Sequence, residues 1–195
     1  MRDIMKHHVS SYQGPRPGDV LMTYSNADTI WRSMRPDDLA ATIALAARIH
    51  PDYPEDDDIF RERLALAPEG CFVLANALGV HGYLISHPWA GHLSPRLNCL
   101  LGSLPAQPDS WYLHDLALDE TVRGQGRAKD AIALAEEAAH TANLPVVSLT
   151  ATGPARAFWL RQGFKPEKIS EAEKAVLASY DPEASFLSRP VSGRG

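Results

Sequence analysis

The sequence predicts an α/β protein with about seven strands and four helices. Strand patterns and helical periodicities alternate between residues 29 and 190, which we take as one domain. At the centre, from Trp111 to Ala142, a strand runs through a glycine loop directly into an amphipathic helix. The full chain has 195 residues, enough for a single domain with a substantial core.

The first part of the predicted domain is a short strand followed by two helices. Residues 1–28 are polar and rich in turn formers, so we expect a mobile tail there. Thr29–Met34 has a strand pattern. Pro36 is suited to the first turn of a helix, which Pro51 would end. A second helix is indicated by the helical spacing of Phe60, Leu64 and Ala67.

Two further strands, Cys71–Ala75 and Val80–Ser86, are separated by a short turn and predict a hairpin. Proline and glycine then punctuate His87–Ser110, which we interpret as a loop with little regular structure. A loop of this length inside a compact domain indicates a functional lid or an insertion.

The central strand lies within WYLHDLAL, in which Leu116 and Leu118 fall on one face and Ala117 on the other. RGQGRA, residues 123–128, forms the glycine loop. The helix after it places small and apolar residues at spacings of three and four, while its charged residues lie elsewhere. The apolar positions are Ala128, Ile132, Ala135, Ala139 and Ala142.

The last quarter of the chain completes the alternation. Val146–Ala151 reads as a buried strand, and Pro154 begins a short helix that Gly163 would cap. Glu171–Leu177 indicates one or two helical turns, and Ala184–Arg189 a final strand. We expect residues 191–195 to be frayed.

The glycine loop predicts an anion site, because a loop that opens a helix presents unpaired backbone N–H groups at the positive end of the helix dipole. Arg123, Arg127 and Lys129 crowd this helix start, where the dipole disfavours cations. A bound polyanion would relieve that conflict, and a solvated surface is the competing interpretation. The loop lacks both the dinucleotide pattern and the ending of a nucleoside-triphosphate loop.

Arg123, Gly126 and Ala128 resemble the Arg/Gln-x-x-Gly-x-Gly/Ala signature of the GNAT N-acetyltransferase superfamily. The preceding LHDLAL, the later AFWLRQGF and the order of elements are also similar to that family. The resemblance implies a twisted mixed sheet with splayed parallel fourth and fifth strands, and acetyl-coenzyme A as cosubstrate. The residues that it implies for coenzyme A are Leu116, Ala117, Leu118, Arg123, Gly124, Gln125, Gly126, Arg127, Ala128, Lys129, Thr152 and Trp159.

The resemblance further implies direct acetyl transfer to a primary amine, with an acidic residue near the fourth strand as base. His114 and Asp115 occupy that place. Strand alternation allows at most one of them to face the acceptor directly. We favour His114, because the free pKa of histidine is near the operating pH, and Asp115 is the close competitor. The plain alternative is that His114 only packs and Asp115 caps the loop.

The chain departs from the family pattern in the helix before Gly163 and Phe164. The family often has Asn, Ala and Tyr where this sequence has Thr152, Ala155 and Trp159, and the tyrosine acts as general acid. Tryptophan has no phenolic proton to give. Tyr112, Tyr180 or water remain as donors, and a coenzyme A-binding module without turnover remains the alternative function.

An acidic run between Asp52 and Asp58 lies where the family binds its acceptor, so it could attract a cationic amine, although a solvated surface explains it as well. Tyr53, His87 and Trp89 could line the acceptor pocket. His50, His81 and His92 have no ligand partners at convincing spacing, so we expect no metal.

Composition excludes several classes of function. The net charge of −5 gives no support to nonspecific nucleic-acid binding. No apolar run approaches the length that spans a membrane. The two cysteines offer neither a disulfide framework nor a metal-ligand spacing, which favours a cytoplasmic protein. We expect a monomer or a homodimer that acts on the primary amine of a small molecule, with a protein amine as the alternative acceptor.

Overall fold

A computed structural model describes residues 29–91 and 94–191. The predicted tail at residues 1–28 lies outside this part, and so do residues 192–195 of the end that we expected to be frayed. Within the described residues, one mixed sheet holds seven strands in the order β1-β2-β3-β4-β5-β7-β6. The predicted α/β class with a mixed sheet is confirmed.

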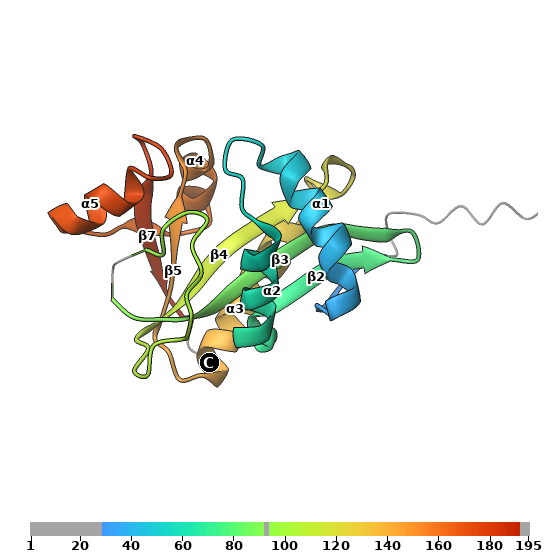
Figure 1. Cartoon of the computed structure of the whole chain (residues 1–195), viewed down its shortest axis with the longest axis horizontal. Coiled ribbons are helices and arrows are strands. Elements are labelled where there is room, and N and C mark those ends of the chain that lie inside the picture. Colours follow the sequence, from blue (N-terminus) through green and yellow to red (C-terminus); the bar gives the residue numbers. More distant parts are fainter. Residues whose placement is uncertain (1–28, 92–93, 192–195) are drawn as a thin grey trace, which may run out of the picture.

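The sheet is built around the long strands β3 and β4, and helices connect its shorter strands (Figure 1). Strand β5 keeps the bounds predicted from its apolar run, and most other boundaries move by only one to four residues. The elements are β1 (Ile30–Ser33), α1 (Leu39–Ile49), α2 (Asp57–Leu66), β2 (Cys71–Asn76), β3 (Gly79–Trp89), β4 (Ser110–Leu118), α3 (Arg127–Thr141), β5 (Val146–Ala151), α4 (Gly153–Arg161), β6 (Lys165–Pro166), α5 (Glu171–Leu177) and β7 (Ser185–Pro190).

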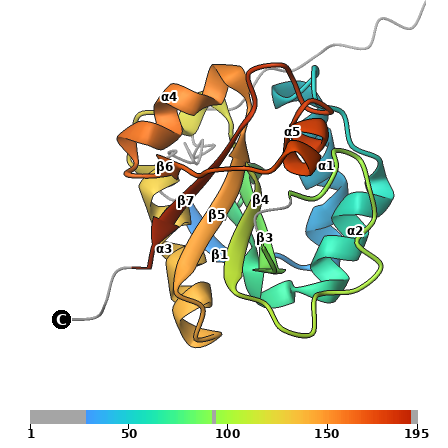
Figure 2. The same ribbon diagram turned by 90° about the vertical axis from the view of Figure 1, so that its left-hand side faces the viewer.

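Helices cover both faces of the sheet, with α1 and α2 on one side and α3 and α4 on the other (Figure 2). The strand period of two divides the core accordingly. On β3, Leu84 packs with the cluster under α3 and α4, whereas Tyr83 and Ile85 pack with the cluster under α1 and α2. A smaller cluster beneath α5 contains Leu177 and Phe186. Burial of these apolar faces is the main stabilising contribution to the fold.

Strands β4 and β5 are parallel, but they pair only over a short stretch. Their register contains two pairs, Trp111 with Val147 and Tyr112 with Ser148. Beyond Tyr112, β4 keeps its partner β3 and has no pair with β5 among the described residues. The predicted splay of these strands is therefore confirmed, and it leaves backbone N–H and C=O groups of β4 facing the gap.

A bulge interrupts the pairing of β3 with β4 at His114. Asp115 lies opposite Ile85 and Leu113 lies opposite the next residue, Ser86, so His114 is the extra residue in β4. A bulged residue leaves the regular alternation of the strand and can aim its side chain differently from its neighbours.

Two details of the sequence prediction differ from the structure. The loop expected to begin at His87 begins after Trp89, because β3 continues through Pro88 and pairs with β4 as far as Ser110. Proline was the reason for ending the strand earlier. The segment expected to make one or two helical turns is α5, which brings the α-helices in the described part to five.

Substitution of Gly70, just before β2, is expected to cause a large loss of stability. A Cβ at this position would lie 2.0 Å from the carbonyl oxygen of Ser86 and 2.8 Å from the Trp111 ring. Both neighbours belong to buried, paired strands, so we expect Gly70→Ala to destabilise the protein by about 3 kcal/mol. That loss corresponds to a melting temperature lower by roughly 6–12 °C in a domain of this size.

Gly102→Ala is the control for this prediction. Gly102 has a φ of +71° and nothing within 4 Å of an added Cβ, so only backbone strain is expected there. Equal melting temperatures for the two variants would contradict the close contact inferred at Gly70.

Candidate functional site

The gap between β4 and β5 opens into two adjoining cavities. One has a volume of about 120 Å³ and the other about 500 Å³. His50, Leu116, Ala155 and Trp159 line both, so these four residues mark the junction of one continuous cleft.

The larger cavity contains the glycine loop and the start of α3. The loop backbone is left-handed at Gly124 and Gly126, with φ angles of 75° and 81°. Gly126 is the N-cap residue of α3, and glycine has no side chain with which to cap the first N–H groups of the helix. An added Cβ at Gly126 would meet nothing within 4 Å. The N–H groups of Arg127 and Ala128 therefore remain available to an anion in the cleft, whereas that of Lys129 donates to the Gly126 carbonyl at 2.8 Å.

Cationic side chains surround the same loop. Arg123, Arg127 and Lys129 all line the larger cavity. The Arg123 Nε donates a hydrogen bond of 3.0 Å to the Leu118 carbonyl, which ties the loop back to the end of β4. Arg127 and Asp130 lie 3.8 Å apart, which offsets one of the three charges only in part. The site therefore combines a helix N-terminus with a net positive charge.

The structure brings most of the predicted coenzyme A residues to this cavity. Gln125 does not line it, and its side-chain amide donates instead to the Thr121 carbonyl at 3.1 Å, within the loop. Thr152 lines the smaller cavity, and Trp159 lines both. The predicted residues that line the larger cavity are Leu116, Ala117, Leu118, Arg123, Gly124, Gly126, Arg127, Ala128, Lys129 and Trp159.

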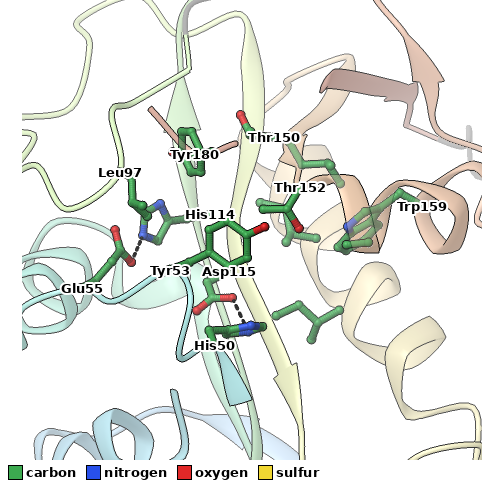
Figure 3. Close-up of a pocket in the computed structure, with 14 residues that line it drawn as sticks. His50, Tyr53, Glu55, Leu97, His114, Asp115, Thr150, Thr152, Trp159 and Tyr180 are labelled. Atoms are coloured by element: carbon green, nitrogen blue, oxygen red, sulfur yellow. Dashed lines mark hydrogen bonds and ion pairs between the residues drawn. The ribbon is translucent and has the colours of Figure 1, made fainter. Parts of the chain in front are cut away.

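His114 and Glu55 form a buried pair in the wall of the smaller cavity (Figure 3). The His114 Nε2 lies 3.0 Å from Glu55 Oε2, and the two side chains are 3% and 7% exposed. Burial on its own raises the pKa of Glu55, but the charge and hydrogen bond of His114 outweigh it, so this pKa lies below its ordinary value. The Nδ1 of His114 is buried without a hydrogen-bond partner among the described residues.

Asp115 takes part in a second polar cluster beside the same cavity. Its Oδ1 lies 3.2 Å from the Nε2 of His50, and its Oδ2 accepts a hydrogen bond of 2.5 Å from the Tyr83 hydroxyl. Burial on its own raises the pKa of Asp115, and hydrogen bonds from His50 and Tyr83 outweigh this and lower it. Asp115 is therefore held as a carboxylate with partners of its own.

The expectation that only one of His114 and Asp115 would face the cleft is wrong. Both line the smaller cavity. The physical reason is the bulge at His114, which breaks the strict alternation on which that expectation relied. The two side chains still separate, since His114 turns to Glu55 and Asp115 turns to His50 (Figure 3).

The chain between β3 and β4 closes the smaller cavity on one side. Within residues 94–102, Leu97 lines the cavity, and its neighbour Asn98 accepts a hydrogen bond of 2.8 Å from the Asp56 N–H. Glu62 on α2 accepts bonds of 2.8 Å from the N–H groups of Leu101 and Gly102. These contacts fasten this segment to α2.

Trp159 stands at the junction, where the family often has a tyrosine. It is 7% exposed and packs edge-on against Phe158 and Phe164. Tyr180 also lines the smaller cavity, but its hydroxyl donates to the Pro95 carbonyl at 2.7 Å. The Tyr112 hydroxyl donates to Thr150 and does not line either cavity.

Of the three aromatic residues predicted to line the acceptor pocket, one lines the smaller cavity and two do not. Tyr53 lines the smaller cavity, as expected. His87 does not, because it is 0% exposed beneath the rings of Tyr112 and His114, and burial lowers its pKa to about 3. Trp89 contacts the His87 ring and lies outside both cavities. Of the acidic run, only Glu55 enters the site, and the four aspartates are exposed.

Glu55 and His50 are the site residues that the sequence did not single out. In the sequence, Glu55 is one of five carboxylates in the acidic run, and His50 has no ligand partner at a convincing spacing. Within residues 29–91 and 94–191, no group of three or more His, Cys, Asp or Glu side chains is arranged to hold a metal, and His92 lies outside them. No helix in this part of the chain has the length and apolar character needed to cross a bilayer.

Comparison with known proteins agrees with this architecture. The sequence model of the acetyltransferase (GNAT) family matches residues 31–164. Among solved structures, the loading GNATL domain of CurA from Lyngbya majuscula superposes with a TM-score of 0.70 at 14% identity, over 85% of this chain and 99% of that one.

Two other structures are similar to a comparable degree. The GphF GNAT-like decarboxylase in complex with isobutyryl-CoA gives a TM-score of 0.69 at 20% identity, over 84% of this chain and 100% of that one. The ribosomal-protein-S18-alanine N-acetyltransferase from Escherichia coli gives 0.58 at 15% identity, over 86% and 96%. At these identities the likeness shows the fold alone. No curated protein sequence matches the chain.

Proposed function

Since the chain belongs to the GNAT acetyltransferase family, we propose that it transfers the acetyl group of acetyl-coenzyme A directly to the primary amine of a small molecule. The observation that carries the proposal is the continuous cleft along β4. A cationic glycine loop lies at one end of this cleft and the Glu55–His114 pair lies at the other.

The cofactor half of the cleft fits coenzyme A in shape and charge. The amides from Gly124 to Ala128 would hold the pyrophosphate, with Arg123 and Arg127 balancing its charge. The unpaired edge of β4 at residues 116–118 would hydrogen-bond an extended pantetheine arm as a neighbouring strand would. The two solved structures described above as GNAT-like decarboxylase and N-acetyltransferase share this fold, and the first contains isobutyryl-CoA.

The acceptor half supplies a base. An alkylamine with a pKa of about 10.4 is neutral in only a few parts in ten thousand at pH 7, so removal of its proton is a useful step. Glu55 accepts from the His114 Nε2, which leaves Nδ1 as the lone-pair nitrogen that takes the proton of the amine. Positioning of the amine against the thioester contributes the rest, and no covalent enzyme intermediate is needed.

The size of the acceptor half favours a small amine over a protein amine. Its volume of about 120 Å³ is below the several hundred Å³ that ordinary ligand pockets occupy. Residues 94–102 are fastened across one side of it. Glu55 and Asp115 line it as carboxylates, which suits a cationic group.

An assay of thiol release tests the proposal. Acetyl-coenzyme A is mixed with the protein and a panel of small primary amines, with a lysine-containing peptide and a peptide with a free N-terminus as comparators. We expect thiol release that depends on at least one small amine and not on the peptides. Release with the peptides alone would contradict the small-molecule assignment.

The alternative function is a coenzyme A-binding module without turnover, and the observation that favours it is Trp159 in place of a tyrosine. This alternative predicts that coenzyme A raises the melting temperature while every amine leaves thiol release at the background rate.

A further inference from the structure

His50 lies at the junction of the cleft, opposite the lining contributed by α4. It directly follows α1 and is the C-cap residue of that helix. It lines the larger cavity, the smaller cavity and a third cavity between α1 and α2. The reacting thioester must bridge the cofactor and acceptor halves, and His50 is one of the four residues found at that boundary.

The surroundings of His50 favour its charged form. Its Nε2 faces the Asp115 carboxylate at 3.2 Å, and the C-terminal end of α1 is the negative end of the helix dipole. Burial on its own lowers the pKa of His50, but the interaction with Asp115 outweighs it and raises this pKa. The titratable and charged groups around it are Asp115 and His114 on β4, Tyr83 on β3, Glu55 and Tyr53 before α2, and Arg123 after β4.

The second ring nitrogen of His50, Nδ1, can donate a proton to a ligand in the cleft. No hydrogen bond to Nδ1 is found within residues 29–91 and 94–191, and about a third of the side chain, 32%, is exposed. Trp159, which shares the junction, carries an indole N–H that does not ionise under these conditions. His50 is therefore the ionisable cation-forming side chain among the four residues at the junction.

We propose that His50 is the proton donor to the departing sulfur of coenzyme A, the step for which the family often uses a tyrosine. This inference rests on the proposed acetyl transfer. As the new N–C bond is made and the C–S bond breaks, sulfur leaves with the electron pair and takes the proton from Nδ1 of the His50 imidazolium. His114 holds the proton lost by the amine, and both histidines then exchange with solvent, which restores the starting state. Asp115 stays ionised throughout and fixes the ring through Nε2.

The first test needs no acceptor. The thiol of coenzyme A bound to the protein is titrated by its ultraviolet thiolate absorbance in the wild type, His50→Gln and His140→Gln. An imidazolium beside the sulfur is expected to lower the thiol pKa by roughly one unit or more. His50→Gln should lose this shift, and His140→Gln, on the exposed end of α3, should keep it. A protein that does not bind coenzyme A contradicts the proposed function, whereas equal thiol pKa values in all three proteins overturn the role of His50 alone.

The second test uses the leaving group. With acetyl-coenzyme A, His50→Gln should lower kcat by about 10-fold or more, while coenzyme A affinity and melting temperature stay near those of the wild type. With an acetyl aryl thioester, whose thiolate leaves without a proton, the ratio of wild-type to variant rates should fall towards one. A merely structural role would lower both rates alike, and that outcome overturns the inference.

Discussion

Replacement of His114 by alanine is expected to lower the rate of acetyl transfer to the amine by about 10²-fold or more while coenzyme A still binds. The side chain removed is the one whose Nδ1 is proposed to take the proton of the amine, and Glu55 would be left as a buried carboxylate without its hydrogen-bond donor. In the proposed complex, coenzyme A would be held by the backbone of β4 and by the loop, which the change leaves in place. Steady-state rates and a coenzyme A titration of the same preparation provide the measurement.

Asp115→Asn and Glu55→Gln complete this experiment. Asparagine keeps the size of Asp115 but removes its charge. If Asp115 is the base, the loss should exceed that of His114→Ala, whereas if it only supports His50 the loss should be smaller than that of His114→Ala. Glu55→Gln keeps an acceptor oxygen for His114 and removes the charge, so we expect a loss smaller than that of His114→Ala. Full activity in both His114→Ala and Asp115→Asn would exclude either side chain as the base.

Replacement of Gly126 by aspartate is expected to abolish the stabilisation that coenzyme A gives to the protein. A ligand present at 100 times its dissociation constant stabilises by about 2.7 kcal/mol, so its loss is easily measured as an absent shift in melting temperature. The new carboxylate would project into the open space in front of the loop amides, where it meets the pyrophosphate as a like charge.

Gly102→Asp is the matched control, because Gly126 and Gly102 have similar φ angles, +81° and +71°, and open space around an added Cβ. Backbone strain should therefore lower the melting temperature of both free proteins by similar amounts. Only the variant at Gly126 should lose the response to coenzyme A. A normal response in Gly126→Asp would show that the phosphates lie elsewhere.

The cofactor half of the site could be predicted from the sequence because it is nearly contiguous. Strand, loop and helix follow one another between Leu116 and Lys129, and each has its own local signal in apolar spacing or glycine content. The single departure is Gln125, whose side chain bonds within the loop rather than facing the cavity. Local pattern specified local structure in this region.

The acceptor half could not be predicted to the same extent, because segments distant in sequence build it. Glu55 meets His114 across 59 positions of the chain, and Tyr180 joins them from the segment after α5. Nothing in the acidic run distinguished Glu55 from its solvated neighbours. Two further errors had a local cause. A proline lies inside β3, where strands usually end, and a bulge inside β4 breaks the strict alternation of its side chains.

The bulge in β4 places the proposed base outside the pairing that holds the sheet together. None of the register pairs between β3 and β4 includes His114. Loss of one codon, that for His114, would leave those pairs available and return β4 to a regular strand. The coenzyme A loop lies downstream of the bulge and would be unaffected. One deletion would therefore remove the proposed base and leave the proposed coenzyme A loop in place.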